Sequence, residues 1–135
     1  MMTQGGSAPV TSVVLVIDDD PAVRNSLKFA LEIEGFSVQV YPTGSALLEE
    51  PDMPKYGCVV ADYNLPGMNG LDLIQLLRER DIRLPAILVT SHPTSAVRNR
   101  ATSAGVNLIE KPLLNDTLFR CIRSALAEAS QRRTP

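Results

Sequence analysis

Apolar segments alternate with segments of helical periodicity along most of the chain. The run VVLVID begins at Val13 and is followed by PAVRNSLKFALEIEG, in which Val23, Leu27 and Leu31 recur at helical spacing before Gly35 ends the pattern. The short apolar run is rich in β-branched residues, which favour a strand. The chain therefore opens with a predicted strand followed by a predicted helix.

The same pattern repeats along the rest of the chain. Later strands are predicted at FSVQVY, GCVVAD, PAILVTS and VNLIE. Later helices are predicted at TGSALLEE, at GLDLIQLLRERD, from about Thr94 to Ala104, and from Asn115 or Asp116 onward. GCVVAD is apolar throughout, which is typical of a parallel strand buried on both faces. Repeated strand and helix units predict an α/β fold with a parallel sheet and helices on both sides.

Composition favours one domain with a single core. The chain has 135 residues, 44% of them hydrophobic, which suffices for one core but not two. Cys58 and Cys121 lack the spacing of a zinc site or a disulfide framework, so we expect them to pack in a reducing cytoplasm. Residues 1–12 lack the features of a signal peptide and are predicted to form a flexible leader. Residues 130–135 are predicted to form a tail.

Charge and hydrophobicity exclude two classes of partner. The net charge is −2, and the only basic cluster is Arg132–Arg133, which argues against direct binding of nucleic acid. No apolar run reaches the roughly 18 residues that a membrane span needs. We therefore expect neither nucleic acid nor membrane as a partner of this chain.

Polar residues gather at the predicted strand ends. The carboxyl ends of parallel strands share one edge, and open α/β sheets bind ligands there. The residues at these ends are Asp18, Asp19, Asp62, Thr90, Ser91, Glu110 and Lys111. Asp20 precedes Pro21 and is assigned to capping the first helix, which leaves Asp18 and Asp19 without a structural role.

Three carboxylates at one edge predict a divalent cation. Burying like charges together is costly unless a cation or a hydrogen-bond donor offsets them. Asp18, Asp19 and Asp62 offer hard oxygen ligands, which suit Mg²⁺ or Mn²⁺ beside a phosphate. Lys111 and the hydroxyl of Thr90 are suited to bind phosphoryl oxygens. The edge is therefore predicted to hold a phosphoryl group next to a metal.

At these motifs the chain resembles the receiver domain of bacterial two-component response regulators, in particular the FixJ-type receivers. The resemblance runs from about Val13 to Ala129 and rests on VIDDDP, VVADYNLPGMNG, ILVTSH and IEKP, in the family's order. It implies a flavodoxin-like (βα)5 three-layer sandwich with a five-stranded parallel sheet of order 2-1-3-4-5. The receiver domain is accordingly assigned to residues 13–129.

The resemblance also implies roles for the pocket residues. Asp62 is the expected phosphoacceptor, receiving its phosphoryl group from a histidine kinase or a phosphotransfer protein as an aspartyl phosphate. Asp19 is the expected main ligand of Mg²⁺ or Mn²⁺, Asp18 assists, and Asn64 contributes its backbone carbonyl. Such a domain is not a turnover enzyme, since it catalyses only its own phosphoryl transfer and dephosphorylation.

Further residues follow from the same resemblance. Thr90 is expected to bond the phosphoryl oxygen and Lys111 to form an ion pair with it. Ser91 and His92 border the pocket, where His92 influences access of water to the phosphoryl group. Pro66 and Gly67 shape the loop beside the acceptor, and the Lys111–Pro112 peptide bond is typically cis in the family.

The switch departs from the family pattern. In the family Thr90 moves toward the phosphoryl group while an aromatic residue on the fifth strand rotates inward. Leu108 holds the aromatic position here, and no Tyr or Phe lies between Tyr63 and Phe119. Either leucine makes a smaller rotation, or coupling runs mainly through Thr90 and the loop after it.

The resemblance also implies two surfaces that meet partners. The face of the fourth helix, fifth strand and fifth helix is a candidate for a phosphorylation-dependent homodimer. Its residues include Val97, Arg98, Arg100, Ala101, Leu108, Glu110 and Arg120. Kinase specificity is expected at residues 23–31 and 113–116.

Alternative functions remain open at this point. VIDDDP also matches the first motif of haloacid-dehalogenase-like phosphatases, with Asp18 as nucleophile and Asp20 as acid. That reading leaves Asp62 without a role and places Ala22 where the motif favours Thr or Val. A phosphorylation-independent docking module is the third reading. The chain is either a single-domain regulator or the receiver part of a longer protein.

Overall fold

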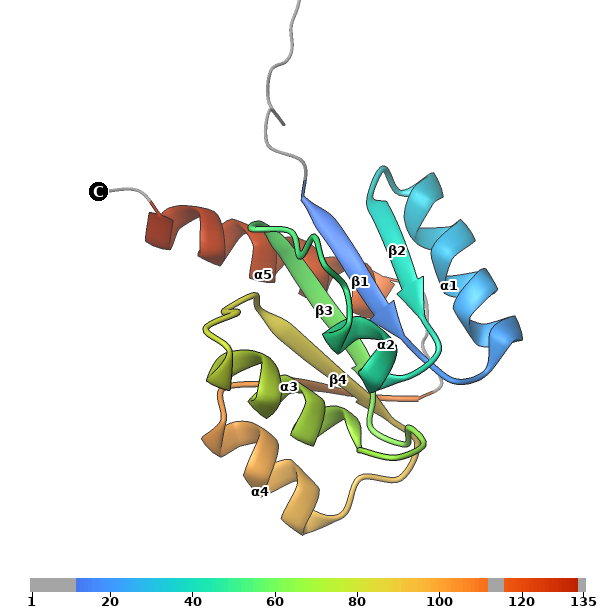
Figure 1. Ribbon diagram of the computed structural model, residues 1–135, viewed down its shortest axis with the longest axis vertical. Helices are drawn as coiled ribbons and strands as arrows, with labels where there is room; N and C mark the ends of the chain where they lie inside the picture. The colour runs from blue at the N-terminus through green and yellow to red at the C-terminus, as the bar shows by residue number, and fades with distance from the viewer. Residues whose placement is uncertain (1–11, 112–115, 134–135) are drawn as a thin grey trace, which may run out of the picture.

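The fold is a five-stranded parallel sheet in the order β2-β1-β3-β4-β5, as the resemblance implied (Figure 1). The computed structural model describes residues 12–111 and 116–133. The strands are β1 (Val13–Ile17), β2 (Ser37–Tyr41), β3 (Gly57–Asp62), β4 (Ala86–Thr90) and β5 (Asn107–Glu110). β1 lies between β2 and β3, because Val13 pairs with both Ser37 and Gly57. The order reverses between β1 and β3, which is where such sheets form their sites.

Five helices cover the two faces of this sheet (Figure 1). They are α1 (Pro21–Ile33), α2 (Gly44–Leu48), α3 (Gly70–Glu79), α4 (Ser95–Ser103) and α5 (Asp116–Arg133). α1 and α5 pack on one face, and α2, α3 and α4 pack on the other. The architecture is therefore the predicted three-layer sandwich, and the predicted alternation of strands and helices is confirmed.

The strands consist mostly of apolar residues because helices bury both faces of the sheet. Val13, Leu15 and Ile17 face the layer of α2, α3 and α4, whereas Val14 and Val16 face the layer of α1 and α5. The helix residues of the first layer include Leu47, Leu71, Leu73, Ile74, Leu77 and Ala101, and those of the second include Leu31, Leu118, Ile122 and Ala125. Burying these side chains supplies the main driving force of folding.

Side-chain caps set where the helices begin. Asp20 caps α1 by accepting a hydrogen bond from the backbone N–H of Ala22, as predicted. Thr43, Asn69 and Thr94 cap α2, α3 and α4 in the same way. The loops that lead from the carboxyl ends of the strands into these helices therefore end at defined residues, which restricts the conformations that the loops adopt.

Several sequence predictions lie wholly or partly outside the described residues. These are the leader up to residue 11, the Lys111–Pro112 bond, the loop 113–115 and the end of the tail.

Cys58 is fully buried in β3 and Cys121 is half-buried in α5, and both are free thiols. None of the described helices combines the length and hydrophobicity that crossing a bilayer requires.

Candidate functional site

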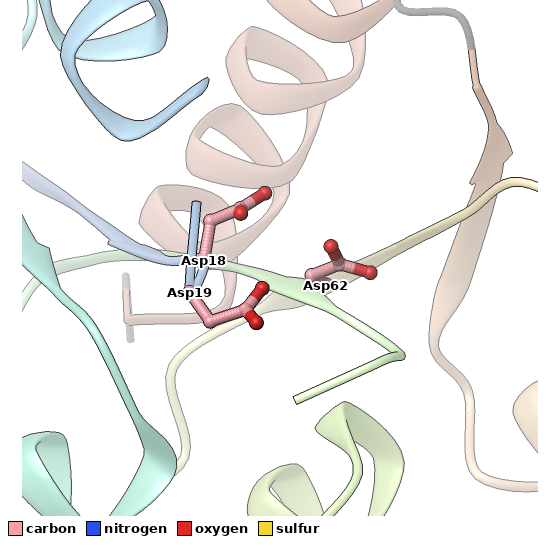
Figure 2. A group of neighbouring side chains, drawn as sticks. All are labelled: Asp18, Asp19 and Asp62. Atoms are coloured by element: carbon pink, nitrogen blue, oxygen red, sulfur yellow. The ribbon is translucent and has the colours of Figure 1, made fainter. Parts of the chain in front are cut away.

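Three carboxylates meet where β1 and β3 end (Figure 2). Ile17 pairs with Ala61 in the sheet, so the residues that follow them, Asp18 and Asp62, lie side by side. One carboxylate oxygen from each of Asp18, Asp19 and Asp62 lies within 4.8 Å of the others. Asp18 and Asp62 are buried, with 4% and 7% exposure, whereas Asp19 is exposed. The predicted gathering of these three residues is confirmed.

Burial and like charges make Asp18 hard to ionise. Removal from water raises the pKa of the Asp18 carboxyl, and the negative charges of Asp62 and Asp19 raise it further. The hydrogen bond from the Asp20 N–H and the charge of Lys111 act in the opposite direction without cancelling the effect. The pocket therefore holds more negative charge than its own cations offset.

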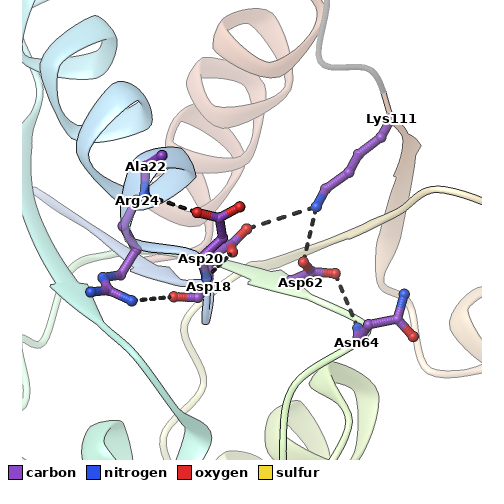
Figure 3. A network of polar contacts seen from close by, with 7 residues as sticks. All are labelled: Asp18, Asp20, Ala22, Arg24, Asp62, Asn64 and Lys111. Atoms are coloured by element: carbon purple, nitrogen blue, oxygen red, sulfur yellow. Dashed lines mark hydrogen bonds and ion pairs between the residues drawn. The ribbon is translucent and has the colours of Figure 1, made fainter.

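Lys111 is the cation within this pocket (Figure 3). Its Nζ lies 2.9 Å from Oδ2 of Asp62 and 3.8 Å from Oδ2 of Asp18. Burial lowers the pKa of Lys111, but the hydrogen bond and charge of Asp62, with the charges of Asp18 and Asp19, outweigh it, so the pKa is raised. The ammonium group therefore stays protonated beside the carboxylates.

Both oxygens of Asp62 have partners. Oδ2 accepts from Lys111, and Oδ1 accepts a hydrogen bond of 3.0 Å from the backbone N–H of Asn64 (Figure 3). The sequence prediction for Asn64 concerned its carbonyl, so this N–H contact was missed. The two-residue spacing between Asp62 and Asn64 could have indicated this contact, because an Asp side chain commonly accepts a hydrogen bond from the N–H two residues later.

A chain of hydrogen bonds orders the loop between β1 and α1. The Asp20 N–H donates to Oδ1 of Asp18 at 2.9 Å, while Oδ1 of Asp20 caps α1. Nη1 of Arg24 donates to the backbone carbonyl of Asp18, also at 2.9 Å (Figure 3). Sequence reasoning did not identify Arg24, because a contact to a backbone carbonyl has no sequence signature.

The neighbouring strand ends place the remaining predicted residues. Thr90 is buried at the end of β4, and its carbonyl accepts from the Lys111 N–H at 2.8 Å. Ser91 is half-buried and His92 is exposed on the loop that follows. Leu108 in β5 pairs with Leu88 and packs, partly buried, into the core on the α4 side.

Gly70 is a further residue that the sequence did not indicate. It begins α3, and a Cβ built there would lie 2.4 Å from the carbonyl oxygen of Asp62 and 2.9 Å from Leu88 Cδ1. Its N–H donates to the carbonyl of Tyr63 at 3.0 Å. The missing side chain therefore lets α3 approach the backbone of the strand end that carries Asp62.

The donor set fits a small divalent cation. Asp18, Asp19 and Asp62 present carboxylate oxygens, which Mg²⁺ prefers over nitrogen or sulfur ligands. A cation there would also offset the repulsion that raises the pKa of Asp18. Asp20, by contrast, uses its carboxylate to cap α1 and is exposed, which does not favour the reading in which it serves as the acid of a phosphatase.

Comparison with known proteins agrees with this geometry. The family model of the response regulator receiver domain matches residues 14–123. The chain belongs to this family, the receiver domains of two-component response regulators. Receiver domains bind Mg²⁺ at an acidic pocket, and response regulators are phosphorylated by histidine kinases through this domain.

Named relatives are longer than this chain. The transcriptional regulatory protein FixJ of Bradyrhizobium diazoefficiens is 34% identical over 117 residues, which cover 86% of this chain and 57% of FixJ. The response regulator protein TodT of Pseudomonas putida is 32% identical over 124 residues, covering 91% of this chain and 55% of TodT. The chain therefore spans a little over half of the length of these relatives.

Solved structures show the same fold. The crystal structure of FixJ-N superposes with a TM-score of 0.78 at 32% identity, covering 86% of this chain and 94% of that one. A CheY-like receiver domain from Methanospirillum hungatei gives 0.83 at 26% identity, covering 91% and 99%. TrrA from Thermotoga maritima, solved in complex with Mg²⁺ and BeF, gives 0.73 at 26% identity, covering 85% and 99%.

Proposed function

We propose that this domain is a phosphorylation-controlled signalling switch with Asp62 as its phosphoacceptor. The donor is a histidine kinase or a phosphotransfer protein, and the domain changes a protein-interaction surface when phosphorylated. One observation carries the proposal: the buried Asp62 carboxylate is bound by Lys111 and lies with Asp18 and Asp19 within 4.8 Å. A nucleophile, a phosphate-binding cation and a metal-binding set are thus assembled at one edge.

The chemistry assigned to Asp62 is nucleophilic. One of its oxygens forms a bond to phosphorus while the bond from phosphorus to the donor nitrogen breaks, and the bonding electrons stay with the donor imidazole. Lys111 then transfers its ion pair from the carboxylate to the phosphoryl oxygens, since its ammonium already lies 2.9 Å from Oδ2. The Thr90 hydroxyl donates to a phosphoryl oxygen from the end of β4.

Asp18, Asp19, Asp62 and the backbone carbonyl of Asn64 are the proposed ligands of Mg²⁺ or Mn²⁺. When bound, the cation supplies positive charge that neutralises phosphoryl oxygens. The donor set and the raised pKa of Asp18 support this assignment. Ser91 and His92 stand at the rim, where His92 regulates how readily water reaches the phosphoryl group.

The proposed switch couples Thr90 to the surface of α4, β5 and α5. Leu108 replaces an aromatic residue, and it contacts the core on the side that α4 covers. A leucine rotation is small, so the displacement of Thr90 and its loop carries most of the signal to α4. The response is a change in contacts with a second copy or a target protein, within a regulatory domain that spans residues 13–129 and acts in the cytoplasm.

Intact mass tests this proposal. Wild-type protein, Asp62→Asn and Asp18→Asn are incubated with acetyl phosphate and Mg²⁺, each with a sample that also contains EDTA. We expect wild type to gain one phosphoryl group, Asp62→Asn to gain none, and Asp18→Asn to gain it slowly because a metal ligand is weakened.

The outcomes separate the competing functions. Labelling that persists in Asp62→Asn but disappears in Asp18→Asn would assign the nucleophile to Asp18 and favour a phosphatase. Absence of labelling in every form, with all proteins folded by circular dichroism, would favour a docking module that works without phosphorylation.

A further inference from the structure

We propose that Arg24 is a positioning residue for the divalent-cation site, an inference that rests on the proposed function. Its Nη1 donates to the backbone carbonyl of Asp18 at 2.9 Å, from the first turn of α1 (Figure 3). This carbonyl belongs to the peptide group that joins Asp18 to Asp19. The hydrogen bond therefore holds the link between two of the proposed ligands.

The position of Asp19 depends on this backbone. Asp18 is held by three hydrogen bonds, besides its ion pair with Lys111: its N–H donates to the Tyr41 carbonyl, its Oδ1 accepts from Asp20, and its carbonyl accepts from Arg24. Within 12–111 and 116–133, by contrast, no hydrogen bond or ion pair fixes the exposed Asp19 carboxylate. Arg24 therefore holds the peptide group from which the Asp19 side chain extends.

Helix stability does not account for an arginine at this position. The N-terminal end of a helix carries partial positive charge, so a cation in the first turn is unfavourable there. Among the described residues the Arg24 guanidinium has no carboxylate partner, and the acceptor that it binds is the Asp18 carbonyl. Lys28, one turn later, instead forms an ordinary exposed ion pair with Glu32 at 2.6 Å.

Residues that orient metal ligands affect affinity without touching the metal. Replacing such a residue typically weakens metal binding about tenfold or more, because the ligands must then be ordered when the metal binds. Loss of the Arg24 contact leaves the Asp18 carbonyl to water and frees the peptide plane to rotate. We therefore expect weaker Mg²⁺ binding and a nearly unchanged labelling rate once Mg²⁺ saturates the site.

Calorimetric titration with Mg²⁺ tests this role. The proteins are wild type, Arg24→Met, which keeps the apolar stem, Arg24→Lys, which keeps a donor, and the matched control Lys28→Met on the same helix. We expect the Kd of Arg24→Met to rise about tenfold, that of Arg24→Lys to rise less, and that of Lys28→Met to stay within about twofold. Labelling by acetyl phosphate is then measured across Mg²⁺ concentrations, where Arg24→Met should approach the wild-type rate at saturation.

Two contrary results have different meanings. If wild type binds Mg²⁺ and Arg24→Met binds it equally well, Arg24 has no positioning role, while the proposed function stands. If wild type itself binds no Mg²⁺, the metal site fails and the inference fails with it. Urea unfolding in EDTA checks that the variants fold; should Arg24→Met not fold, Arg24→Gln, whose side chain is too short to replace the guanidinium contact, takes its place, and a Kd equal to that of Lys28→Met would overturn the role.

Discussion

At the scale of single residues, Asp18 shows a conflict between stability and function. Its carboxylate is buried beside Asp62 and Asp19, and burial followed by these like charges raises its pKa above the ordinary 3.8. Lys111 offsets part of this cost from 3.8 Å, but its closer partner is Asp62. Without a metal ion, the buried charge of Asp18 therefore destabilises the fold, although the proposed metal site requires this carboxylate.

Asp18→Asn should stabilise the metal-free protein. An amide keeps an oxygen that accepts from the Asp20 N–H and carries no charge, so we expect the free energy of unfolding at pH 7 in EDTA to rise by roughly 1 kcal/mol. Urea unfolding measures this. With added Mg²⁺ the wild type should become the more stable of the two proteins, since it binds the cation more tightly.

The stability difference between Asp18→Asn and the wild type should depend on pH. Because the folded-state pKa of Asp18 lies above its unfolded value, the contribution of Asp18 to stability is full below pH 3.8 and is lost as the pH rises through the raised pKa. The advantage of Asp18→Asn should therefore shrink as the pH falls toward 3.8. An Asp18→Asn protein that is less stable than wild type at pH 7 in EDTA would contradict this description of the pocket.

Polar and charged residues at strand ends were predictable, whereas residues that act through backbone contacts were not. Asp18, Asp62, Thr90 and Lys111 stand out because polar groups interrupt apolar runs at a common edge. Gly70, like Arg24, contacts backbone groups, and its role depends on how closely α3 approaches β3. Such distances follow from packing and not from spacing along the chain.

At the scale of elements, α4 is held to the rest of the domain mainly by polar contacts. Ala101 is its only fully buried residue among those described, whereas α3 buries five. Arg98 pairs with Glu110 at 3.1 Å and Arg100 with Asp72 at 2.6 Å, and Arg78 donates to the carbonyl of Ala104. Exposed ion pairs contribute little each, so α4 can shift at low cost when Thr90 moves.

Phosphorylation should change self-association through the face of α4, β5 and α5. We expect the dimer association constant to rise on the order of tenfold with acetyl phosphate and Mg²⁺, as sedimentation velocity measures. Arg98→Glu, which reverses a charge on this face, should reduce the gain. Arg83→Glu is the control, because Arg83 pairs with Asp81 in the loop before β4. Identical sedimentation of free and phosphorylated wild type would count against the dimer.

The elements themselves were largely predictable. Apolar runs marked all five strands because each is covered on one or both faces by helices, and the capping residue Asp20 marked the start of the first helix. The predicted fourth helix, Thr94 to Ala104, differs from α4 only by its two capping residues. α5 begins at Asp116, one of the two predicted starts.

At the scale of the whole molecule, the order of strands was the feature that periodicity did not determine. Alternating strands and helices restrict the fold to a parallel sheet, yet several orders satisfy that restriction. The order 2-1-3-4-5 came from resemblance to receiver domains, and the pairing of β1 with both β2 and β3 confirms it. That order matters chemically, because it sets Asp18 next to Asp62 and Lys111 two strands away from β3.

The most direct measurement is the position of the phosphoryl group on wild-type protein. The chain is labelled with acetyl phosphate and Mg²⁺ and reduced with borohydride, which converts an acyl phosphate to an alcohol, and peptides are then sequenced by mass spectrometry. If Asp62 is the phosphoacceptor, we expect homoserine at position 62 and unmodified aspartate at positions 18 and 19. Conversion at Asp18 with Asp62 unchanged would contradict it.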